Sequence, residues 1–489
     1  MSPSFTRSAA PALFFIVFAF TLGACSSPHP PAIAIAHVTV IDTTGGAPLP
    51  DFSVVIQGSR ILAVGPSTTT AIPRGATLLD GTGKFLIPGL ADMHIHLTGA
   101  GEPSGSREFI IPLLVANGVT AVRDMGGNVA YLKALRFEIN SGKRVGPQIF
   151  FTGPYLDGYP PSFQPSIVVE TPAEATAAVQ KLKGEGVDFV KVQSGLQPEP
   201  YYAIARESER QNIRFIGHVP DSITAADASR AGQASIEHLT GVLLGCSTRE
   251  GELRQRKLEL PPLKETDAQV LARNQAWTKD LLDSYSQQKA ADLFQKFCAN
   301  HTWQVPTLPL LIHLAYQVPG SDRRGDPRLK YIPRDVRENW DKTQYQTFDS
   351  HTEADFALRR CLVKQSLAAV KAMKEAGVSI MAGTDAAAPN VFPGFSLHED
   401  LFYFVEAGLT PMQALQAATI RPAEFLGRSA EQGTIEAGKR ADLVLLDANP
   451  LDDIRNTQRI QVVVVNGQII GRSDLDALLT RVERFAATH

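Results

Sequence analysis

Cysteine is scarce in this chain of 489 residues, and no two cysteines form a CxxC pair. The four that occur are Cys25, Cys246, Cys298 and Cys361. The last three are odd in number and widely separated, so they do not indicate a disulfide framework, and we expect buried free thiols. A zinc site built from thiolates is therefore not expected.

An excess of positive charge is also missing. The chain has 47 lysines and arginines against 50 acidic residues, which gives a net charge of -3. Proteins that bind nucleic acid usually carry a basic stripe, so we expect no nucleic-acid partner. With 44% hydrophobic and 20% charged residues, the composition is that of a globular protein with one large domain or two.

No hydrophobic run is long enough to span a bilayer comfortably. The most apolar stretch, residues 12–22, follows a weakly basic start and is typical of a signal peptide. We therefore expect residues 1–25 to be a signal peptide and the Pro/Ala-rich residues 26–36 to be a tether.

The end of this segment resembles a bacterial lipobox, because Leu22-Gly23-Ala24 precedes Cys25. That resemblance makes Cys25 the lipidated first residue of the mature protein. Ser26 does not resemble an inner-membrane retention signal, which favours a lipid anchor in the outer membrane, on the periplasmic side. The alternative is an ordinary secretory peptide, which would release the protein into the periplasm.

Short alternating strands occur at both ends of the chain. Gly58-Ser59 lies where a hairpin turn belongs, and Asn466-Gly467 between two apolar runs is a strong two-residue hairpin signal. The pattern predicts one small β-sandwich domain made from both termini, residues 37–84 and 429–475. A C-terminal helix over residues 476–489 follows it.

The middle of the chain alternates apolar runs with helical sequence. Eight runs are expected to be strands: residues 85–96, 119–125, 148–156, 188–194, 214–219, 234–239, 303–310 and 379–385. Eight such units predict an α/β fold, a (β/α)8 TIM barrel over residues 85–428. The long polar segments after the sixth and seventh runs, about 242–302 and 312–377, are expected to be helical. They either roof the site or are solvated helices without a catalytic role.

Polar side chains occupy the ends of several of these runs. His94 and His96 end the first run and point to the same side, because side chains alternate along a strand. Active sites of barrels lie at the C-terminal ends of the strands. Four further residues of this kind end other runs: Lys191, His218, His238 and Asp385. Imidazole and carboxylate ligands suit zinc and its neighbours. A protonated lysine cannot ligate a metal, but a lysine carboxylated by carbon dioxide can.

Several motifs resemble the amidohydrolase superfamily, in its imidazolonepropionase-like branch. They are PGLADMHIHL, GVTAVRDMG, FVKVQ, GHV, SIEHL, AGTDA, AGLTPMQALQAATIRPAEFLG and GTIEAGKRADLVLLD. The motifs occur in the family's order and cover nearly everything from His37 to Gln468.

The resemblance implies a pair of divalent metal ions, zinc or another transition metal. It implies that His94, His96 and Asp385 hold the more buried ion and that His218 and His238 hold the more exposed one. Carboxylated Lys191, together with a hydroxide, bridges the two. Asp385 then takes the proton of that hydroxide and delivers it to the leaving group.

Three further residues are candidates for substrate contact. Arg123 ends the second run and either touches substrate or pairs with Asp124, and we favour the pairing. Tyr155 follows the third run and either donates to a substrate oxygen or is one of the aromatic residues common at barrel rims. His398 follows the eighth run and is expected to orient a ligand or a loop.

The resemblance also disfavours several reactions known in the superfamily. Deaminases of the superfamily usually carry a glutamate shortly after the histidine of the fifth strand, and HVPDSITAAD has none. Lys191 suits a two-metal site rather than the single metal of a true imidazolonepropionase. Dipeptidases typically carry a tyrosine two residues after that histidine, where this chain has Pro220, and a histidine in the third-strand loop, which GPYLDGYPPSF lacks.

We therefore predict a two-metal hydrolase that cleaves a carbon–nitrogen bond in a small-molecule amide. A dipeptidase of Xaa-Pro-like type with altered carboxylate recognition, or a lactonase, would use the same site. A binding lipoprotein without activity predicts damage among the six ligands, and none is missing. The long segments could add substrate contacts from Arg323, Arg324 or Tyr331. Substrate identity, native metal and oligomeric state stay open.

Overall fold

The computed structural model describes residue 1 and residues 31–98, 105–259, 268–316, 325–348 and 351–489. Residues 2–25 of the predicted signal peptide, which include Cys25, and residues 26–30 of the predicted tether lie outside these residues, as do Arg323 and Arg324. Within the described part of the chain, no helix has both the length and the apolar character that crossing a membrane requires.

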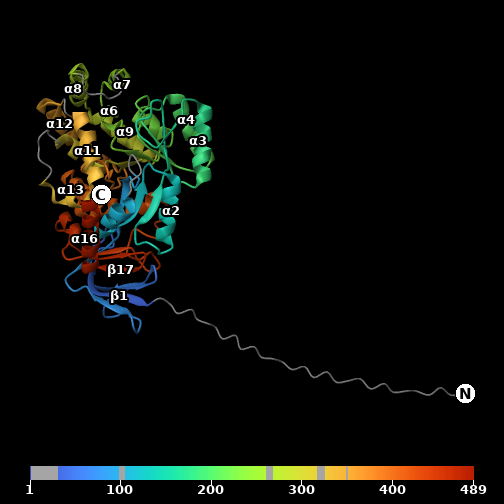
Figure 1. Ribbon diagram of the computed structural model, residues 1–489, viewed down its shortest axis with the longest axis vertical. Helices are drawn as coiled ribbons and strands as arrows, with labels where there is room; N and C mark the ends of the chain where they lie inside the picture. The colour runs from blue at the N-terminus through green and yellow to red at the C-terminus, as the bar shows by residue number, and fades with distance from the viewer. Residues whose placement is uncertain (2–30, 99–104, 260–267, 317–324, 349–350) are drawn as a thin grey trace.

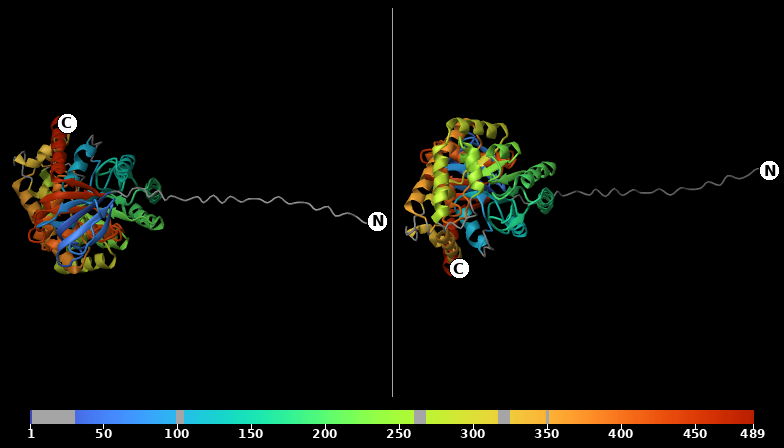
Figure 2. Two further views of the ribbon diagram at one scale, coloured as in Figure 1. Left: turned by 90° about the horizontal axis from the view of Figure 1, so that it is seen from below. Right: turned by 90° about the horizontal axis from the view of Figure 1, so that it is seen from above.

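Strands from both ends of the chain form one eight-stranded sheet in the order β17-β16-β15-β5-β1-β2-β3, with β4 paired to β1. Their bounds are Ala32–Val40 (β1), Leu49–Gln57 (β2), Arg60–Pro66 (β3), Thr77–Asp80 (β4), Phe85–Pro88 (β5), Leu443–Leu446 (β15), Ile460–Val465 (β16) and Gln468–Gly471 (β17). The sheet lies at one end of the molecule (Figures 1 and 2). The two termini thus share one β-region, but the predicted sandwich of two sheets is not confirmed.

Both predicted hairpin turns are present. Gly58-Ser59 connects β2 to β3, with Gly58 at φ 58°. Asn466 and Gly467 connect β16 to β17 with φ values of 50° and 74°. Two consecutive positive φ values are those of a type I′ turn, which Asn-Gly adopts more easily than other pairs.

The predicted strand over residues 85–96 is two strands in two different sheets. β5 pairs with β15 in the terminal sheet, whereas β6, Leu90–Ile95, pairs with β7, Val119–Asp124, in the central region. Gly89 separates them, and a Cβ at this position would lie 2.2 Å from Oγ1 of Thr120. The sequence pattern did not indicate this change of sheet, because the strands on both sides of Gly89 are largely buried and therefore equally apolar.

The central strands form a three-stranded sheet, β6-β7-β8, and a six-stranded sheet, β10-β9-β11-β12-β13-β14. The bounds of the others are Gln148–Phe151 (β8), Tyr155–Asp157 (β9), Ser166–Val168 (β10), Val190–Val192 (β11), Phe215–Gly217 (β12), Ser235–Glu237 (β13) and Trp303–Val305 (β14). Neighbouring strands are parallel, as an α/β fold of the TIM-barrel type requires.

The predicted eighth strand, residues 379–385, forms isolated bridges instead of a strand. Ile380 bridges to Gln304 beside β14, and Ala386 bridges to Ile95 of β6. This segment therefore links the two central sheets, and one continuous closed sheet is not formed.

Helices alternate with the central strands and surround them (Figures 1 and 2). Their bounds are Ile111–Ala116 (α1), Val129–Asn140 (α2), Pro172–Glu185 (α3), Pro198–Arg210 (α4), Ala225–Arg230 (α5), Phe395–Glu406 (α13), Pro411–Ala417 (α14), Ile420–Phe425 (α15) and Arg472–Thr488 (α16). Short turns of other helix types cover Ser106–Ile110, Pro327–Tyr331 and Ile454–Gln458. Helix α16 begins four residues before the predicted C-terminal helix. The start of helix α3 is determined by its local sequence, because Thr171 and Glu174 form a capping box there.

The two long polar segments are helical, as predicted, in the residues that the structure describes. The first contains α6 (Val242–Gly245), α7 (Glu250–Leu258), α8 (Ala268–Asp283) and α9 (Gln287–Ala299). The second contains α10 (Leu308–Tyr316), α11 (Arg334–Phe348) and α12 (Glu353–Ala376). Helices α7, α8 and α12 lie at the end of the molecule opposite the terminal sheet (Figure 1).

Candidate metal centre

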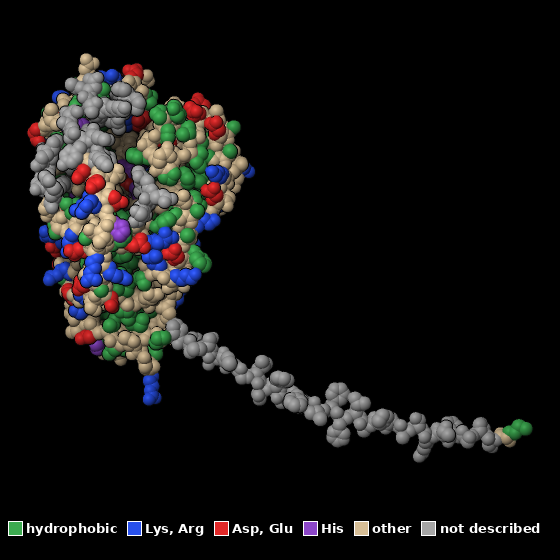
Figure 3. Space-filling view, viewed as in Figure 1, with side chains coloured by type: hydrophobic (Ala, Val, Ile, Leu, Met, Phe, Trp, Pro, Cys, Tyr) green, Lys and Arg blue, Asp and Glu red, His purple; other side chains and the backbone are tan. Residues whose placement is uncertain are grey.

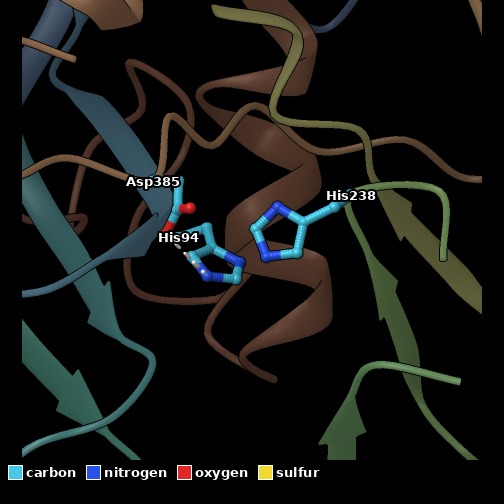
Figure 4. A group of neighbouring side chains, drawn as sticks. All are labelled: His94, His238 and Asp385. Carbon is cyan, nitrogen blue, oxygen red and sulfur yellow. Dashed lines mark ion pairs between the residues drawn. The ribbon is translucent and has the colours of Figure 1, made fainter. Parts of the chain in front are cut away.

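Six polar side chains that the sequence analysis singled out lie at the C-terminal ends of the central strands. His94 is in β6, Lys191 is in β11, and His96 comes directly after β6. His218 and His238 each follow the last residue of their strands, β12 and β13, and Asp385 lies in the segment that bridges to β6. Figure 4 shows His94, His238 and Asp385 pointing toward one another from three separate elements.

The side chains approach one another closely enough to share a metal ion. Oδ1 of Asp385 lies 3.3 Å from Nε2 of His94 and 3.0 Å from Nε2 of His96. The ring centroid of His238 lies 4.4 Å from that of His94 and 5.0 Å from that of His218. Ligand atoms of His94, His238 and Asp385 all lie within 4.8 Å of one another. This group combines residues that the resemblance assigns to two different ions.

All four histidines use Nδ1 for contacts with the protein. Nδ1 lies 2.8 Å from Oε2 of Glu237 in His94, 2.9 Å from Oγ of Ser194 in His218, and 2.7 Å from Oγ1 of Thr307 in His238. The Nδ1 atom of His96 lies 3.3 Å from the hydroxyl of Tyr155. The carboxylate partner fixes the tautomer of His94, and the hydroxyl partners hold the orientation of the other three rings, as in metal-ligating histidines. Nε2 of each ring is thereby left for a ligand role.

One of these nitrogens is left without a hydrogen bond. Nε2 of His94 is buried and, although it is near Asp385, it has no hydrogen-bond partner among the residues that the structure describes. Buried polar atoms in native proteins are normally satisfied, so an orphaned nitrogen needs an explanation. A divalent metal ion supplies one, and the nitrogen and carboxylate atoms around it are ligands that zinc accepts.

The pKa values favour the ligand forms of these groups. Burial, followed by the charge of His94, lowers the pKa of His238 to about 3, and burial also lowers the pKa of His218 well below its usual range. Burial opposes ionisation of Asp385, but the charges of His238 and His94 hold its pKa well below the usual range. His218 and His238 are therefore neutral and Asp385 is ionised at neutral pH. Burial favours the neutral form of His96, but the neighbouring carboxylate of Asp385 outweighs it and raises the pKa of that ring.

Lys191 is 1% exposed, and its ammonium forms no hydrogen bond or ion pair with a residue in the described part of the chain. Burial lowers its pKa to about 8. Its Nζ lies 6.0 Å from the ring centroid of Tyr155. Burial thus increases the fraction of neutral amine at neutral pH, and this is the form that reacts with carbon dioxide. Gly217 makes room for the lysine, because a Cβ there would lie 2.9 Å from Cδ of Lys191.

Two ligands have a strained backbone. The φ angle is 56° at His238 and 68° at Asp385. Residues with a Cβ rarely adopt this left-handed conformation, which costs on the order of 1–3 kcal/mol. Such strain gathers at functional sites, where the surrounding structure holds the side chain in place. Here the backbone N–H of Asp385 donates to the carbonyl of His94, which fixes the two ligands relative to each other.

Arg123 supports a ligand rather than facing a substrate. It is fully buried, and its Nη2 donates to Glu237 at 2.9 Å, while its Nε donates to the carbonyl of Met93. The expected pairing with Asp124 is therefore wrong. Glu237 in turn accepts from Nδ1 of His94, and its pKa falls to about 2 because Arg123 and His94 outweigh the effect of burial.

Tyr155 lies beside the centre, and His398 does not contact it. The Tyr155 side chain is 6% exposed, and burial raises the pKa of its hydroxyl, which touches His96. His398 is buried in α13, and its Nδ1 lies 2.9 Å from Oγ1 of Thr457. His398 was expected to orient a ligand or a loop. Its Nδ1 contacts Thr457 and no metal ligand among the described residues, so only the second alternative, that it orients a loop, stays a prediction.

Two buried carboxylates that sequence reasoning missed hold the segment around Asp385. Asp92 accepts from the backbone N–H of His94 at 3.2 Å and from the hydroxyl of Thr384 at 2.7 Å. Asp400 accepts from the backbone N–H of Gly383 at 3.1 Å. Burial raises the pKa of Asp92 to about 7. Its position two residues before His94, on the same face of β6, was a signal that could have identified it.

Known proteins resemble this chain over most of its length. The amidohydrolase family model matches residues 85–470. An ochratoxinase from Aspergillus niger is 23% identical, with 88% of this chain and 84% of that protein aligned. An imidazolonepropionase from Paracidovorax citrulli is 25% identical, with 86% of this chain and 91% of that protein aligned. The solved structure of a candidate prolidase from Bifidobacterium longum has a TM-score of 0.65 at 26% identity, covering 93% of this chain and 100% of its own.

Proposed function

The chain belongs to the amidohydrolase family, and on that premise we propose that it uses two divalent metal ions to cleave an amide bond in a small molecule. Family membership makes it a hydrolytic enzyme that acts on carbon–nitrogen bonds. The imidazolonepropionase relative agrees with the branch that the sequence motifs indicate. The two ions, the carboxylated lysine and the substrate class are what we propose.

One observation carries the proposal. Four imidazoles direct Nδ1 to protein partners and leave Nε2 available around a buried lysine and an ionised carboxylate. Neutral imidazoles and a carboxylate are metal ligands, and a lysine with a pKa of about 8 can be carboxylated at neutral pH. Six ligand groups are more than one tetrahedral ion needs, which supports a second ion.

Divalent metal ions held in this centre would lower the pKa of a bound water and polarise the amide carbonyl. His94, His96 and Asp385 would hold one ion, and His218 and His238 would hold the other. The carbamate of Lys191 would lie between the two groups. Zinc fits this set of nitrogen and oxygen ligands, and other transition metals fit it as well.

Asp385 is the residue of this chain that moves a proton. Its carboxylate is ionised at neutral pH, and 14% of its side chain remains exposed, so water can reach it. It accepts a proton from the attacking water and donates it to the leaving nitrogen. Tyr155 stays protonated beside His96, and Glu237 holds the imidazole of His94 from behind.

Dipeptide hydrolysis is the second candidate, and the similarity to a candidate prolidase favours it. Pro220, which occupies the position of a carboxylate-binding tyrosine in such enzymes, argues against it. A lactone is a further substrate class for the same chemistry, because the activated water attacks any polarised carbonyl.

A hydrolysis screen of the purified, zinc-loaded protein tests the proposal. The panel contains N-acyl amino acids, dipeptides, cyclic amides and lactones. Turnover of amides that needs bound metal supports the proposal, and turnover of dipeptides alone or lactones alone supports the second or the third candidate. A protein with two bound ions and no turnover of any of these substrates would contradict all three.

We also propose that the protein is anchored to the bacterial cell envelope through Cys25, on the periplasmic side of the outer membrane. The lipobox-like sequence before this cysteine supports the proposal. Cells that express the chain with Cys25→Ala should lose incorporation of labelled fatty acid and release the protein from the membrane fraction. Unchanged labelling in that variant would exclude lipidation at this residue.

A further inference from the structure

The loop after β9 carries unusually exposed aromatic side chains. Tyr159 and Phe163 lie in residues 158–165 and are 76% and 54% exposed. This loop contains no aspartate, glutamate, lysine, arginine or histidine. Large apolar groups held in water mark contact sites more often than chance. We use the name aromatic rim for Tyr155 and Phe163, whose rings contact each other.

The aromatic rim is continuous with the metal centre. The ring centroid of Phe163 lies 6.4 Å from that of Tyr155 at an angle of 56°, and the hydroxyl of Tyr155 touches Nδ1 of His96. Two direct side-chain contacts therefore connect the loop to His96, one between Phe163 and Tyr155 and one between Tyr155 and His96. Tyr155 also packs on Gly126, where a Cβ would lie 2.2 Å from the ring.

The centre is open on the side that the aromatic rim borders. The side chains of His96 and Asp385 remain 19% and 14% exposed, whereas the His94 side chain is fully buried. The partly exposed ring of His96 contacts Tyr155, so the exposed edge of the centre lies next to the aromatic rim. In the view of Figure 3, the molecule is hollowed in its upper half.

Hydrogen bonds hold the loop in place. The buried carboxylate of Asp157 accepts from the backbone N–H of Gly158 at 2.9 Å, of Ser162 at 2.7 Å and of Gly195 at 3.0 Å. At the other end of the loop, the backbone N–H of Tyr155 donates to the carbonyl of Pro165. The exposed rings thus belong to an anchored loop, and a ligand that binds them loses little free energy to loop ordering.

We propose that the aromatic rim binds an aromatic or large apolar group next to the scissile amide, so that the enzyme selects aromatic amides. This inference rests on the proposed function and names its substrate class. Aromatic rings gain free energy by stacking edge-to-face or offset, and the exposed ring of Phe163 offers such a partner. The lack of charged residues in the loop disfavours a charged group at this position.

Two pairs of substrates test the proposal in the zinc-loaded protein. N-benzoylglycine against N-acetylglycine varies the acyl side, and N-acetylphenylalanine against N-acetylalanine varies the amine side. The wild type should prefer the aromatic member of at least one pair. Phe163→Ala should lower kcat/KM for that member by about 10- to 100-fold and leave its aliphatic counterpart within about twofold. Phe163→Leu should retain part of the preference.

Phe137→Ala is the matched control, because Phe137 is also an exposed phenylalanine, at 62%, but lies on α2. It should leave both substrate pairs unchanged. A Phe163→Ala variant that keeps the full aromatic preference would overturn the proposal while amide hydrolysis stands.

Calorimetry on the Asp385→Asn variant measures binding of the same compounds without turnover. It therefore distinguishes failure of the aromatic selectivity from failure of the proposed hydrolysis. This variant should bind the preferred aromatic compound more tightly than its aliphatic counterpart, and adding Phe163→Ala should remove the difference. An equal affinity for both compounds before the second substitution would overturn the proposal even if the enzyme cleaved neither of them.

Discussion

Nδ1 of His94 lies 2.8 Å from Oε2 of Glu237, and both side chains are fully buried. Glu237 is also bound by Arg123 at 2.9 Å, so a single carboxylate connects a buried cation to a proposed metal ligand. The carboxylate orients the imidazole and increases its basicity toward a metal ion. The structure thus joins β6, β7 and β13 through one ionised network behind the centre.

Glu237→Gln should weaken metal binding by about 10- to 100-fold, because an amide holds the imidazole less firmly than a carboxylate. It should also destabilise the protein, since Arg123 keeps a buried charge without a counter-ion. Metal affinity by chelator competition and unfolding by urea measure the two effects. Adding Arg123→Met should restore stability but not metal affinity. Unchanged affinity in Glu237→Gln would show that His94 needs no carboxylate partner.

The sequence was sufficient to place the ligands at strand ends but not to find what supports them. His94 and His96 could be placed because alternation and the barrel rule depend on a local run of residues. Glu237 could not be assigned, because its partner His94 is 143 positions away along the chain. Sequence separation also explains why Arg123 was wrongly predicted to pair with Asp124. Asp124 is its neighbour in sequence, whereas its partner Glu237 is 114 positions away.

The errors in the fold have a similar cause. The run over residues 85–96 is apolar from Phe85 to Ala91, on both sides of Gly89, so its pattern did not reveal that Gly89 divides it between two sheets. The hairpins at Gly58 and Asn466-Gly467 were predictable, because positive φ values are a local property of those residues. His398 was assigned a role by resemblance alone, and only tertiary packing showed that it contacts Thr457.

Lys191→Ala should lose the second metal ion and most activity, because it removes the carbamate that we propose as the bridge between the two ions. Lys191→Arg is the matched variant, since arginine stays protonated and does not form a carbamate. Metal content by plasma mass spectrometry and turnover on the best amide measure the effect. Labelled bicarbonate should give a carbamate signal in the wild type only. Two bound ions and a full rate in Lys191→Ala would exclude the bridging role.

Asp385→Asn should still bind at least one metal ion but turn over more slowly by about a hundred- to ten-thousand-fold. The amide oxygen can remain a ligand, whereas the amide cannot accept the proton of the attacking water. Metal content and kcat separate these two functions of the residue. A rate equal to that of the wild type would remove Asp385 from proton transfer.

Glu399 should give the protein a pH-dependent stability in acid. Burial opposes its ionisation, but His313, Arg328 and Ser396 lower its pKa from 4.5 to about 2. A lowered folded-state pKa stabilises the protein above the unfolded value, and the effect disappears as the pH falls through the folded value. Urea unfolding should therefore show Glu399→Gln less stable by up to about 3 kcal/mol near neutral pH, with the difference shrinking between about pH 4.5 and 2. A difference that is independent of pH would show that the carboxylate charge is not responsible.

Trp340 should position the backbone that carries Asp385. Its Nε1 donates to the carbonyl of Ala387 at 3.2 Å, and its ring contacts that of Phe392 at 5.8 Å. Trp340→Phe keeps most of the packing but removes the donor, so the loop after Asp385 gains freedom. Because small displacements of a catalytic group are costly, kcat should fall by about 10- to 100-fold while metal content stays unchanged.

Trp277→Phe is the control for this prediction, since its Nε1 also donates to a carbonyl, that of Leu253, at 2.8 Å. Leu253 lies in α7, which carries none of the ligands, so the control should keep the wild-type kcat. If both substitutions lowered kcat equally, the cause would be loss of packing in the helical segments in general. A loss confined to Trp340→Phe would instead assign the second long segment a role in catalysis, through a single hydrogen bond to the loop that follows Asp385.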